Sequence, residues 1–465
     1  MTDGASPALL TDLYQLTMAQ GYWKAGRDRH EAVFHHYFRA DPFRGGYALA
    51  CGLGPAAGFL ERFRFAPDDL DYLAGLAGTE GGPLFDPGFL EVLRGFRPQL
   101  DLDAVPEGTV VFAPEPLLRV RGPLLECQLF ETALLNIVNF QTLIATKASR
   151  IVLAAGGAPV LEFGLRRAQG FDGGLSASRA AYAGGCAGTS NVLAGKLLGI
   201  PVRGTHAHSW VMAFSGEDEA FETWARTSTG GCVLLVDTYD TLEGVRRAVA
   251  AGLRLKARGR RLAGIRLDSG DLAALSRAAR EMLDAAGLAD CLITASSDLD
   301  EHAIARLRAQ GAPIAVWGVG TRLVTGHDQP ALGGVYKLSA LRPPDGDWED
   351  KMKTADDAAK ASYPGMLQVR RFRAGGKPLR DVIYDIREPL SGAGEDLLVP
   401  VFRRSERVRR EEDLTAIRER ALAQLRELPE QFRRLAGPRQ FPVELDAPLH
   451  ARRERLRGGR EARMQ

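Results

Sequence analysis

The sequence predicts an α/β protein whose central feature is a parallel β/α barrel. Six short apolar runs lie in the middle of the chain, and each ends on small, polar side chains that suit chemistry. These runs are Val160–Phe163, Pro201–Thr205, Val233–Val236, Ala263–Leu267, Leu292–Ala295 and Ile314–Trp317. Helix-like segments separate the later four, an alternation typical of such a barrel. Because parallel barrels place their chemistry at the carboxyl ends of the strands, the polar clusters are expected to share one site.

The composition is that of an ordinary globular protein, and 465 residues are enough for two or three domains. A net charge of +2 provides no overall field for nucleic acid or membrane. No run approaches the ~18 consecutive apolar residues of a membrane span, and we see no signal peptide. Five scattered cysteines, none in a C-x-x-C pair, argue against a zinc site or a disulfide framework. We therefore expect a cytoplasmic protein.

Elements outside these runs are also predicted. Helices are expected over Leu10–Gly21, Leu124–Ala145 and Glu411–Leu428, strands over Thr109–Phe112 and Leu117–Val120, and loops and hairpins over 343–380. The first helix has Thr11 as its expected N-cap and Gly21 as its expected end. In the barrel, Asp271 is placed to cap a helix over Leu272–Ala286. The Arg-rich tail, 451–465, is expected to fray as solvated surface.

Two glycine pairs are candidates for binding phosphate. Gly318 and Gly320 follow a predicted strand, where glycines let the backbone turn tightly and point several N–H groups at an anion. The hydroxyl of Thr321 adds a further donor. Gly333 and Gly334, just downstream, allow another close approach of the backbone to a ligand. The alternative is a pair of tight turns in an irregular barrel.

Three arginines follow or end predicted strands. Arg166 and Arg167 resemble an anion clamp, because guanidinium forks bind both phosphate and carboxylate. Strand alternation sends Arg266 and Asp268 to the same side, where they suit an acidic or phosphorylated ligand with sugar hydroxyls. The alternatives are solvated surface for the first pair, and a simple ion pair for the second with Asp271 as a helix cap.

His206 and His208 stand two residues apart, so an extended segment would place them on one side. A metal pair is conceivable, but no third ligand with metal spacing lies beside them. A nucleophile or general base is better supported, because histidine titrates near pH ~6.5 and keeps a free lone pair at pH 7. A hydrogen-bonded structural histidine is the alternative for each.

Several ordered segments share their sequence with one known family. The most specific are Leu10–Gln15, Phe163–Gly170, Ser190–Gly195, Gly204-Thr205 with Ala207–Ser209, Asp237–Tyr239, Arg266–Asp271 and Leu332–Leu338. They resemble nicotinate phosphoribosyltransferase from Leu10 to about Leu338, and more loosely to the end of the chain.

The resemblance implies an irregular parallel β/α barrel joined to an α/β sandwich built from N- and C-terminal segments. We expect 1–140 to form the N-terminal part of the sandwich, 141–345 the catalytic barrel, and 346–465 the segment that completes the sandwich, with its basic tail. The implied reaction converts nicotinate and 5-phosphoribosyl 1-diphosphate to nicotinate mononucleotide and diphosphate in NAD salvage. It is coupled to hydrolysis of ATP with Mg²⁺. A homodimer with shared active sites is implied, with no nucleic-acid or membrane partner.

The resemblance also implies the roles of individual residues. His208 precedes a serine and takes the place of the family's phosphohistidine, and Asp268 is the other residue expected to be catalytic. Nicotinate contacts are expected at Tyr14 from the neighbouring subunit, Arg166, Ser190, Thr205 and Arg266. Contacts to phosphoribosyl diphosphate are expected at Arg167, Asp268, Gly318, Gly320, Thr321, Gly333 and Gly334. Carboxylates suit the positive charge that builds on the ribose, and cations suit the polyphosphate.

The nearest alternative is a nicotinamide phosphoribosyltransferase of the same fold. Such relatives carry a carboxylate where this chain has Ser190, so the serine favours the acidic substrate. A quinolinate enzyme is disfavoured because that family is much shorter. A barrel aldolase would need a lysine at a strand end, and an RNA-binding protein would need aromatic and basic stacking platforms. Neither feature is found in the sequence.

Overall fold

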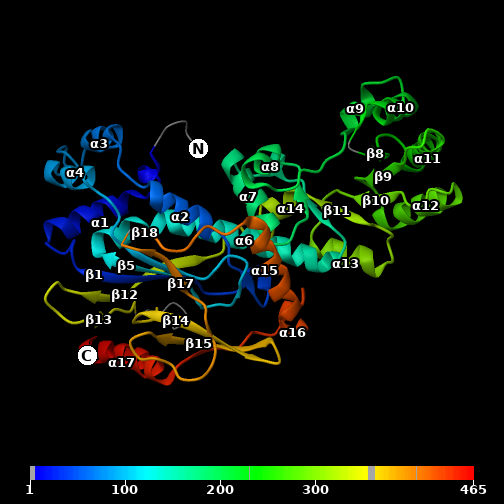
Figure 1. Cartoon of the computed structure of the whole chain (residues 1–465). Coiled ribbons are helices and arrows are strands. Elements are labelled where there is room, and N and C mark those ends of the chain that lie inside the picture. Colours follow the sequence, from blue (N-terminus) through cyan, green and yellow to red (C-terminus); the bar gives the residue numbers. More distant parts are fainter. Residues whose placement is uncertain (1–5, 230, 354–361, 405, 465) are drawn as a thin grey trace. The chain divides into compact units, whose positions relative to one another are not determined.

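The computed structural model describes residues 6–229, 231–353, 362–404 and 406–464. The chain divides into two compact units (Figure 1). The barrel unit is Ile144–Pro330, and the sandwich unit joins Met1–Leu143 to Ala331–Gln465. Part of the loop region predicted over 343–380 falls on 354–361, outside the described residues. None of the described helices combines the length and the apolar character needed to cross a bilayer.

The barrel unit is built on one sheet of six parallel strands, which confirms the predicted fold class. The strand order is β7-β6-β11-β10-β9-β8. Along the chain these are β6 (Val160–Glu162), β7 (Gly188–Thr189), β8 (Cys232–Leu235), β9 (Leu262–Leu267), β10 (Leu292–Ala295) and β11 (Val316–Val319). All but one of the predicted runs therefore form strands, with small shifts at some ends.

The predicted strand Pro201–Thr205 is wrong. Only Val202 pairs in this run, through an isolated parallel bridge to Thr189 at the end of β7. Proline has no N–H to donate and Gly204 weakens a strand, so the run does not extend into a ladder. No ladder of the described residues joins β7 to β8, so the sheet curls without closing into a full barrel.

Helices cover the sheet of the barrel unit. They are α7 (Phe171–Ala183), α8 (Val192–Leu198), α9 (His208–Met212), α10 (Glu217–Thr227), α11 (Thr241–Ala257), α12 (Leu272–Ala285), α13 (Glu301–Ala309) and α14 (Thr321–Val324). Asp240, Asp271 and Asp300 cap α11, α12 and α13 by accepting backbone N–H groups of the first turn. The predicted cap at Asp271 is therefore confirmed. These caps start each helix shortly after the preceding strand ends.

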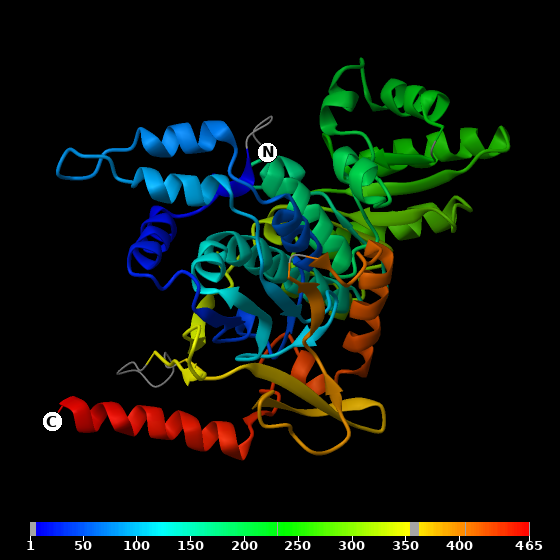
Figure 2. The ribbon, with the colours of Figure 1, turned by 60° about the vertical axis from the view of Figure 1, so that its left-hand side comes forward.

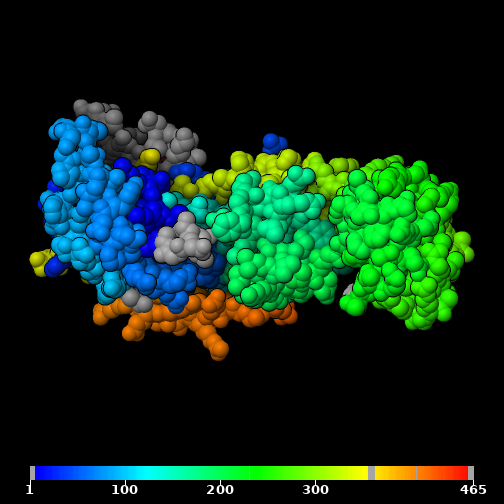
Figure 3. Space-filling view, turned by 90° about the horizontal axis from the view of Figure 1, so that it is seen from above, coloured from blue at the N-terminus to red at the C-terminus, as the bar shows by residue number. Residues whose placement is uncertain are grey.

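The sandwich unit contains a seven-stranded sheet, a four-stranded sheet and a two-stranded sheet. The first has the order β13 (Glu349–Asp350), β12 (Gly334–Arg342), β1 (Glu31–Phe38), β5 (Pro116–Pro123), β3 (Asp101–Ala104), β17 (Val399–Arg403), β18 (Glu406–Arg407). The others are β16 (Glu395–Asp396), β14 (Leu367–Ala374), β15 (Lys377–Asp385), β19 (Val443–Leu445), and β2 (Ala48–Leu49) with β4 (Val110–Val111). N-terminal residues (blue) lie directly against C-terminal residues (orange) in this unit (Figure 3).

The two larger sheets share one apolar core, as a sandwich requires. Leu367, Val369 and Ile383 of the four-stranded sheet are buried in the same cluster as Leu118 and Val120 of β5. The strands predicted over Thr109–Phe112 and Leu117–Val120 are confirmed as β4 and β5. The sequence did not predict β1, whose side chains are almost all buried although two of them are histidines.

Helices complete the sandwich unit, and α6 continues into the barrel unit. They are α1 (Leu13–Lys24), α2 (Leu53–Arg62), α3 (Pro67–Ala74), α4 (Pro87–Arg94), α5 (Leu124–Leu129), α6 (Glu131–Ala155), α15 (Leu414–Glu427), α16 (Glu430–Arg433) and α17 (Ala447–Met464). The helix predicted over Glu411–Leu428 is confirmed as α15, whereas the one predicted over Leu124–Ala145 is interrupted at Phe130. Helix α1 starts later than predicted: Asp12, not Thr11, stands at its N-cap position. Gly21 lies inside α1, which ends just before Gly26, a glycine with a left-handed φ of 63°.

The predicted fraying of the tail 451–465 is wrong, because α17 extends to Met464. Arg452 anchors this helix through ion pairs with Asp350, Asp385 and Glu388. Figure 2 shows α17 (red) beside the hairpin of β14 and β15. A tail whose arginine is paired with three carboxylates is held by tertiary contacts that sequence composition does not reveal.

A buried ion cluster joins α6 to α13 inside the barrel unit. One oxygen of Glu301 forms an ion pair with Lys147 Nζ at 2.8 Å, and the other accepts a hydrogen bond from Arg150 Nε at 2.9 Å. These side chains are at most 2% exposed. Burial alone would raise the pKa of Glu301, but the two cations outweigh burial and hold that pKa below its ordinary value. Removing the carboxylate would leave two buried positive charges without this partner.

We therefore predict that Glu301→Gln lowers the free energy of unfolding by about 3–5 kcal/mol, the usual loss when one partner of a buried ion pair is removed. Urea unfolding followed by circular dichroism measures this loss. Glu222→Gln is the matched control, because Glu222 pairs with Arg254 and Arg258 on the surface. The control should lose less than about 1 kcal/mol. Equal, small losses in both variants would contradict the prediction.

Candidate active site

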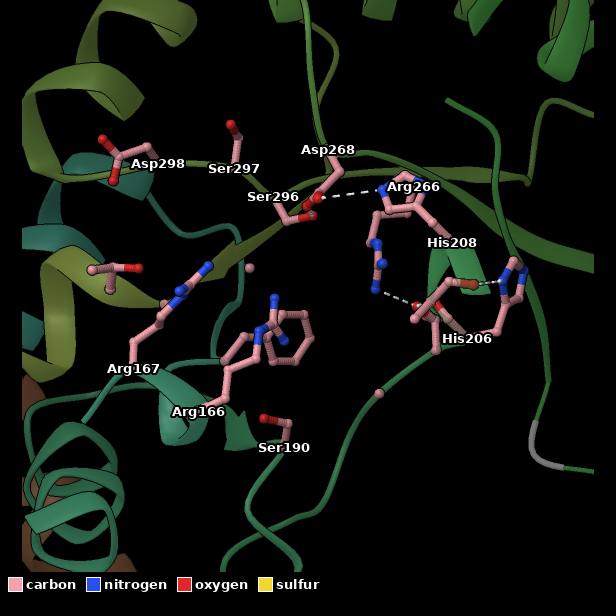
Figure 4. Close-up of a pocket in the computed structure, with 17 residues that line it drawn as sticks. Arg166, Arg167, Ser190, His206, His208, Arg266, Asp268, Ser296, Ser297 and Asp298 are labelled. Carbon is pink, nitrogen blue, oxygen red and sulfur yellow. Dashed lines mark hydrogen bonds and ion pairs between the residues drawn. The ribbon is translucent and has the colours of Figure 1, made fainter. Parts of the chain in front are cut away.

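A cavity of about 680 Å³ opens in the barrel unit at the carboxyl ends of its strands. It brings together most of the predicted site residues: Arg166, Arg167, Ser190, Thr205, His208, Arg266, Asp268, Gly318, Gly320 and Thr321. Figure 4 shows Arg166, Arg167 and Ser190 reaching in from one side, with Asp268 and Ser296 on the other. Parallel strands collect these groups because their carboxyl ends converge.

Three predicted residues lie in the sandwich unit instead. Tyr14 stands on α1 with its side chain about half exposed. Burial, together with the charges of Glu131 and Asp12, raises the pKa of Tyr14. Gly333 has a left-handed φ of 74° and begins the approach to β12, where Gly334 is the first residue.

Arg166 and Arg167 are exposed and lie on a short 3-10 turn, Leu165–Arg167, directly after β6. Neither forms an ion pair with a carboxylate of the described residues. The carboxylate of buried Glu162 fixes the start of this turn by accepting the N–H of Gly164. The turn therefore presents two free guanidinium groups on an anchored backbone, which is what binding of an anion requires.

Arg266 lies at the end of β9 and donates to the hydroxyl of Thr205 at 2.5 Å. The Nε of Arg266 is buried and has no hydrogen-bond partner among the described residues. Burial lowers the pKa of Arg266, although Asp268 and Asp237 oppose that effect. The predicted alternative of a simple ion pair between Arg266 and Asp268 is not seen, so no carboxylate of the described residues is in ion-pair contact with this partly buried cation.

His208 is the first residue of α9 and faces the carboxylate of Asp268. Its Nδ1 lies 3.2 Å from the hydroxyl of Thr238, and its Nε2 lies 3.7 Å from Asp268 Oδ2. Asp268 is itself oriented, because it accepts the hydroxyl of Ser296 while Asp237 accepts its backbone N–H at 2.7 Å. The imidazole is 41% exposed, so a ligand can reach it.

His206 has the structural role that the sequence left open for it. The residue is 5% exposed, and its ring packs against Trp224 with centroids 4.9 Å apart. Nε2 accepts the backbone N–H of Leu235 at 3.2 Å, which leaves Nδ1 to carry the proton near the carbonyl of Ala207. Burial lowers the pKa of His206 to about 4, so the ring is neutral at pH 7.

The glycines serve packing as well as any ligand. A Cβ on Gly318 would lie 2.7 Å from the ring of Phe163, and a Cβ on Gly334 would lie 2.0 Å from Asn139 Oδ1. Space for a side chain is therefore missing at both positions without any bound molecule. At Gly320 a Cβ would meet the Phe163 carbonyl at 3.2 Å, a tight but less severe contact.

Several cavity residues were absent from the predicted site. They are Phe163, Gly204, His206, Ala207, Ser296, Ser297 and Asp298. A sequence signal existed for Ser296 to Asp298, because two hydroxyls and a carboxylate directly follow the apolar run that became β10. Ser297 has a φ of 132°, a left-handed value unusual for a residue with a side chain and often found at functional sites.

The fold and the cavity define the class of protein: an α/β enzyme that receives an anionic small molecule at the carboxyl ends of parallel strands. Three family models match the chain. They describe the N-terminal domain (residues 9–139), the family itself (159–372) and the C-terminal domain (391–453) of nicotinate phosphoribosyltransferase.

Curated relatives agree with these models. Nicotinate phosphoribosyltransferase of Bacillus subtilis is 49% identical over 79% of this chain and 73% of its own. That of Mycobacterium tuberculosis is 43% identical over 97% and 94%. The crystal structure of human nicotinic acid phosphoribosyltransferase superposes with a TM-score of 0.83 at 34% identity, covering 96% of this chain and all of that one. This chain therefore belongs to the nicotinate phosphoribosyltransferase family.

The buried state of His206 predicts a pH dependence of stability. Its pKa is lowered to about 4 in the folded protein, whereas a histidine in an unfolded chain has a pKa of ~6.5. Between these values the unfolded state binds a proton that the folded state does not, so stability falls as the pH falls from 6.5 towards 4. His206→Gln should reduce this slope by about 1.4 kcal/mol per pH unit, the value for one proton. Urea unfolding at pH 6.5, 5.5 and 4.5 measures it, and an unchanged slope would contradict the assignment.

Proposed function

We propose that this protein catalyses the transfer of the phosphoribosyl group of 5-phosphoribosyl 1-diphosphate to nicotinate, as its relatives' names indicate. The products are nicotinate mononucleotide and diphosphate, in NAD salvage. One observation carries the proposal: Arg166, Arg167 and Arg266 line the cavity without an ion-pair partner among the described residues, beside the pair of His208 and Asp268. A carboxylate, a phosphate and a diphosphate are the anions that the two substrates bring.

In the transfer, the ring nitrogen of nicotinate forms a bond to C1 of the ribose while the bond from C1 to the diphosphate oxygen breaks. The electron pair leaves with diphosphate, and positive charge builds on the ribose. Asp268, already oriented by Ser296 and Asp237, is suited to stabilise that charge. It needs no rearrangement, which is the main advantage of a preorganised site.

The remaining roles divide between the two substrates. We assign nicotinate to Tyr14, Arg166, Ser190, Thr205 and Arg266, and phosphoribosyl diphosphate to Arg167, Asp268, Gly318, Gly320, Thr321, Gly333 and Gly334. The unpaired Nε of Arg266 and the absence of a carboxylate at Ser190 support an acidic ring substituent rather than the amide of nicotinamide.

We assign His208 as the phosphohistidine that couples the reaction to ATP. The γ-phosphoryl group passes from ATP to the imidazole and ADP leaves. Water later attacks the phosphorus, which releases phosphate and restores the ring. The exposure of His208 supports this role, whereas Nε2 of His206 already accepts a backbone N–H and its Nδ1 faces a carbonyl.

Magnesium is the expected metal. No group of three or more His, Cys, Asp or Glu side chains in the described parts of the chain is placed to hold a metal. Asp268 and Asp298 are the carboxylates that line the cavity. This set fits Mg²⁺, which is commonly held by one or two carboxylates together with substrate phosphates. When bound, the ion neutralises charge on the phosphates.

The assembly we propose is a homodimer in which Tyr14 reaches nicotinate in the neighbouring subunit. Tyr14, Leu10, Leu13 and Met18 expose an apolar face at the start of the chain. Phe171 and Val192 expose apolar side chains on the barrel unit, each about 70% accessible. Such faces commonly mark protein contacts. All five cysteines are buried, and no disulfide is assigned among the described residues, which supports a reducing compartment such as the cytoplasm.

A product assay tests the function directly. Purified protein is incubated with 5-phosphoribosyl 1-diphosphate and either nicotinate or nicotinamide, with and without ATP and Mg²⁺. Nicotinate mononucleotide should form, and faster with ATP. Formation of nicotinamide mononucleotide at a greater rate would favour the other substrate and overturn the proposal.

We predict that His208→Ala abolishes ATP-stimulated turnover and leaves slower transfer without ATP, because the ring that receives the phosphoryl group is lost. Acid-labile label from γ-³²P-ATP should disappear in the same variant. His206→Gln is the matched control and should keep the label. Label that persists in His208→Ala but is lost in His206→Gln would reverse the assignment.

We predict that Arg266→Ala raises the KM for nicotinate roughly ten- to a hundred-fold, since a charged hydrogen bond contributes about 1.5–3 kcal/mol. Arg266→Lys should raise it less, because the charge remains. Steady-state kinetics with nicotinate and with nicotinamide measure both variants. The nicotinamide KM should change little, since no carboxylate is then lost. Equal effects on both substrates would show that Arg266 does not face the ring substituent.

A further inference from the structure

We propose that the sandwich unit carries a second anion site, suited to a small molecule with two or more phosphate groups. The site is a cavity of about 400 Å³ lined by Arg29, Arg121, Arg342 and Arg404, together with Glu31 and Asp101. It shares no residue with the cavity of the barrel unit. The inference is therefore independent of the proposed reaction.

Two of the arginines are fixed in place by one carboxylate. Glu31 begins β1, which pairs with β5 on one side and β12 on the other. One oxygen of Glu31 accepts a hydrogen bond from Arg121 Nε at 2.5 Å, and the other accepts a hydrogen bond from a terminal nitrogen of Arg342. The ring of Trp348 faces both guanidinium groups, at 5.4 and 5.1 Å from its centroid. Each arginine keeps further N–H groups that these contacts do not use.

A third arginine is presented by an unusual backbone. Arg404 follows β17 with a φ of 46°, a left-handed value that is uncommon for a residue with a side chain. Its N–H donates to Asp101 Oδ1 at 3.0 Å, which holds the strained turn. The guanidinium itself contacts no carboxylate among the described residues. Strain of this kind is often retained at binding sites.

The charge balance favours an anionic ligand. Four arginines and two carboxylates line the cavity, and Glu31 and Asp101 are already engaged by Arg121, Arg342 and the Arg404 backbone. Arg29 also lies 3.9 Å from Asp28, a carboxylate outside the cavity lining. Guanidinium forks match phosphate oxygens bidentately. The volume lies within the range of small-molecule sites, about 300–1,000 Å³, so one phosphate would leave most of it unfilled. A compound with a diphosphate or triphosphate group satisfies both the charge and the size.

Inorganic triphosphate is the probe, used with the full chain. Hydrogen exchange measured by mass spectrometry should show protection of peptides that cover 118–124 and 338–349 when triphosphate is added. In the double variant Arg342→Gln with Arg404→Gln this protection should disappear. In titration calorimetry, the affinity of one triphosphate-binding event should fall at least ten-fold. Turnover of nicotinate without added triphosphate should stay at the wild-type level.

Arg439→Gln is the matched control, because Arg439 is an exposed arginine of the same unit outside the cavity. It should keep both the protection and the binding event. If the double variant does not fold, Arg29→Gln with Arg404→Gln removes two exposed cations of the same cavity and should weaken binding likewise. Protection that is absent from the wild type, or unchanged in the cavity variants, would overturn the proposal. Equal protection by a glutamate hexapeptide would overturn the choice of phosphate.

Discussion

The candidate active site depends on one buried carboxylate. Glu162 ends β6 and is 1% exposed, so its charge must be met by hydrogen-bond donors. It accepts the N–H of Gly164, the hydroxyl of Ser178 at 2.9 Å and the hydroxyl of Thr189 at 2.5 Å, while its own carbonyl accepts the N–H of Ser190. These donors come from the arginine turn, α7 and the end of β7. One side chain therefore fixes three segments that contribute to the cavity.

The cavity then holds its charges apart. Arg166 and Arg167 stand on the anchored turn, while Asp268 and Asp298 follow β9 and β10 on the other side (Figure 4). If these groups met, they would neutralise one another and leave little for a ligand. Arg266 shows the consequence most clearly, because burial lowers its pKa and no carboxylate of the described residues pairs with it. Unpaired charges of this kind destabilise the folded protein when the cavity is empty, and a bound anion offsets that destabilisation.

How much of this the sequence predicts depends on how local each feature is. Strand ends and polar clusters were predicted because short apolar runs and capping residues such as Asp271 act within a few residues. The sequence did not predict that Val202 forms only a single bridge, or that the two-residue strand β7 exists. Their pairing is decided by strands that are distant in the sequence. The same holds for α17, which Arg452 anchors to carboxylates far away in the chain. Gly318 was predicted from its possible ligand contact, yet the ring of Phe163 would already crowd a side chain at this position.

The two histidines show how a site separates neighbours that sequence cannot. Their spacing suggested one shared face, but α9 begins at His208 and the chain changes direction there. His206 turns to Trp224 and the backbone of Leu235, where burial keeps it neutral. His208 turns to Asp268 and remains accessible. A ring that already accepts a backbone N–H would have to break that bond before it could accept a phosphoryl group. The fold therefore places the two imidazoles in different surroundings, although they are two residues apart.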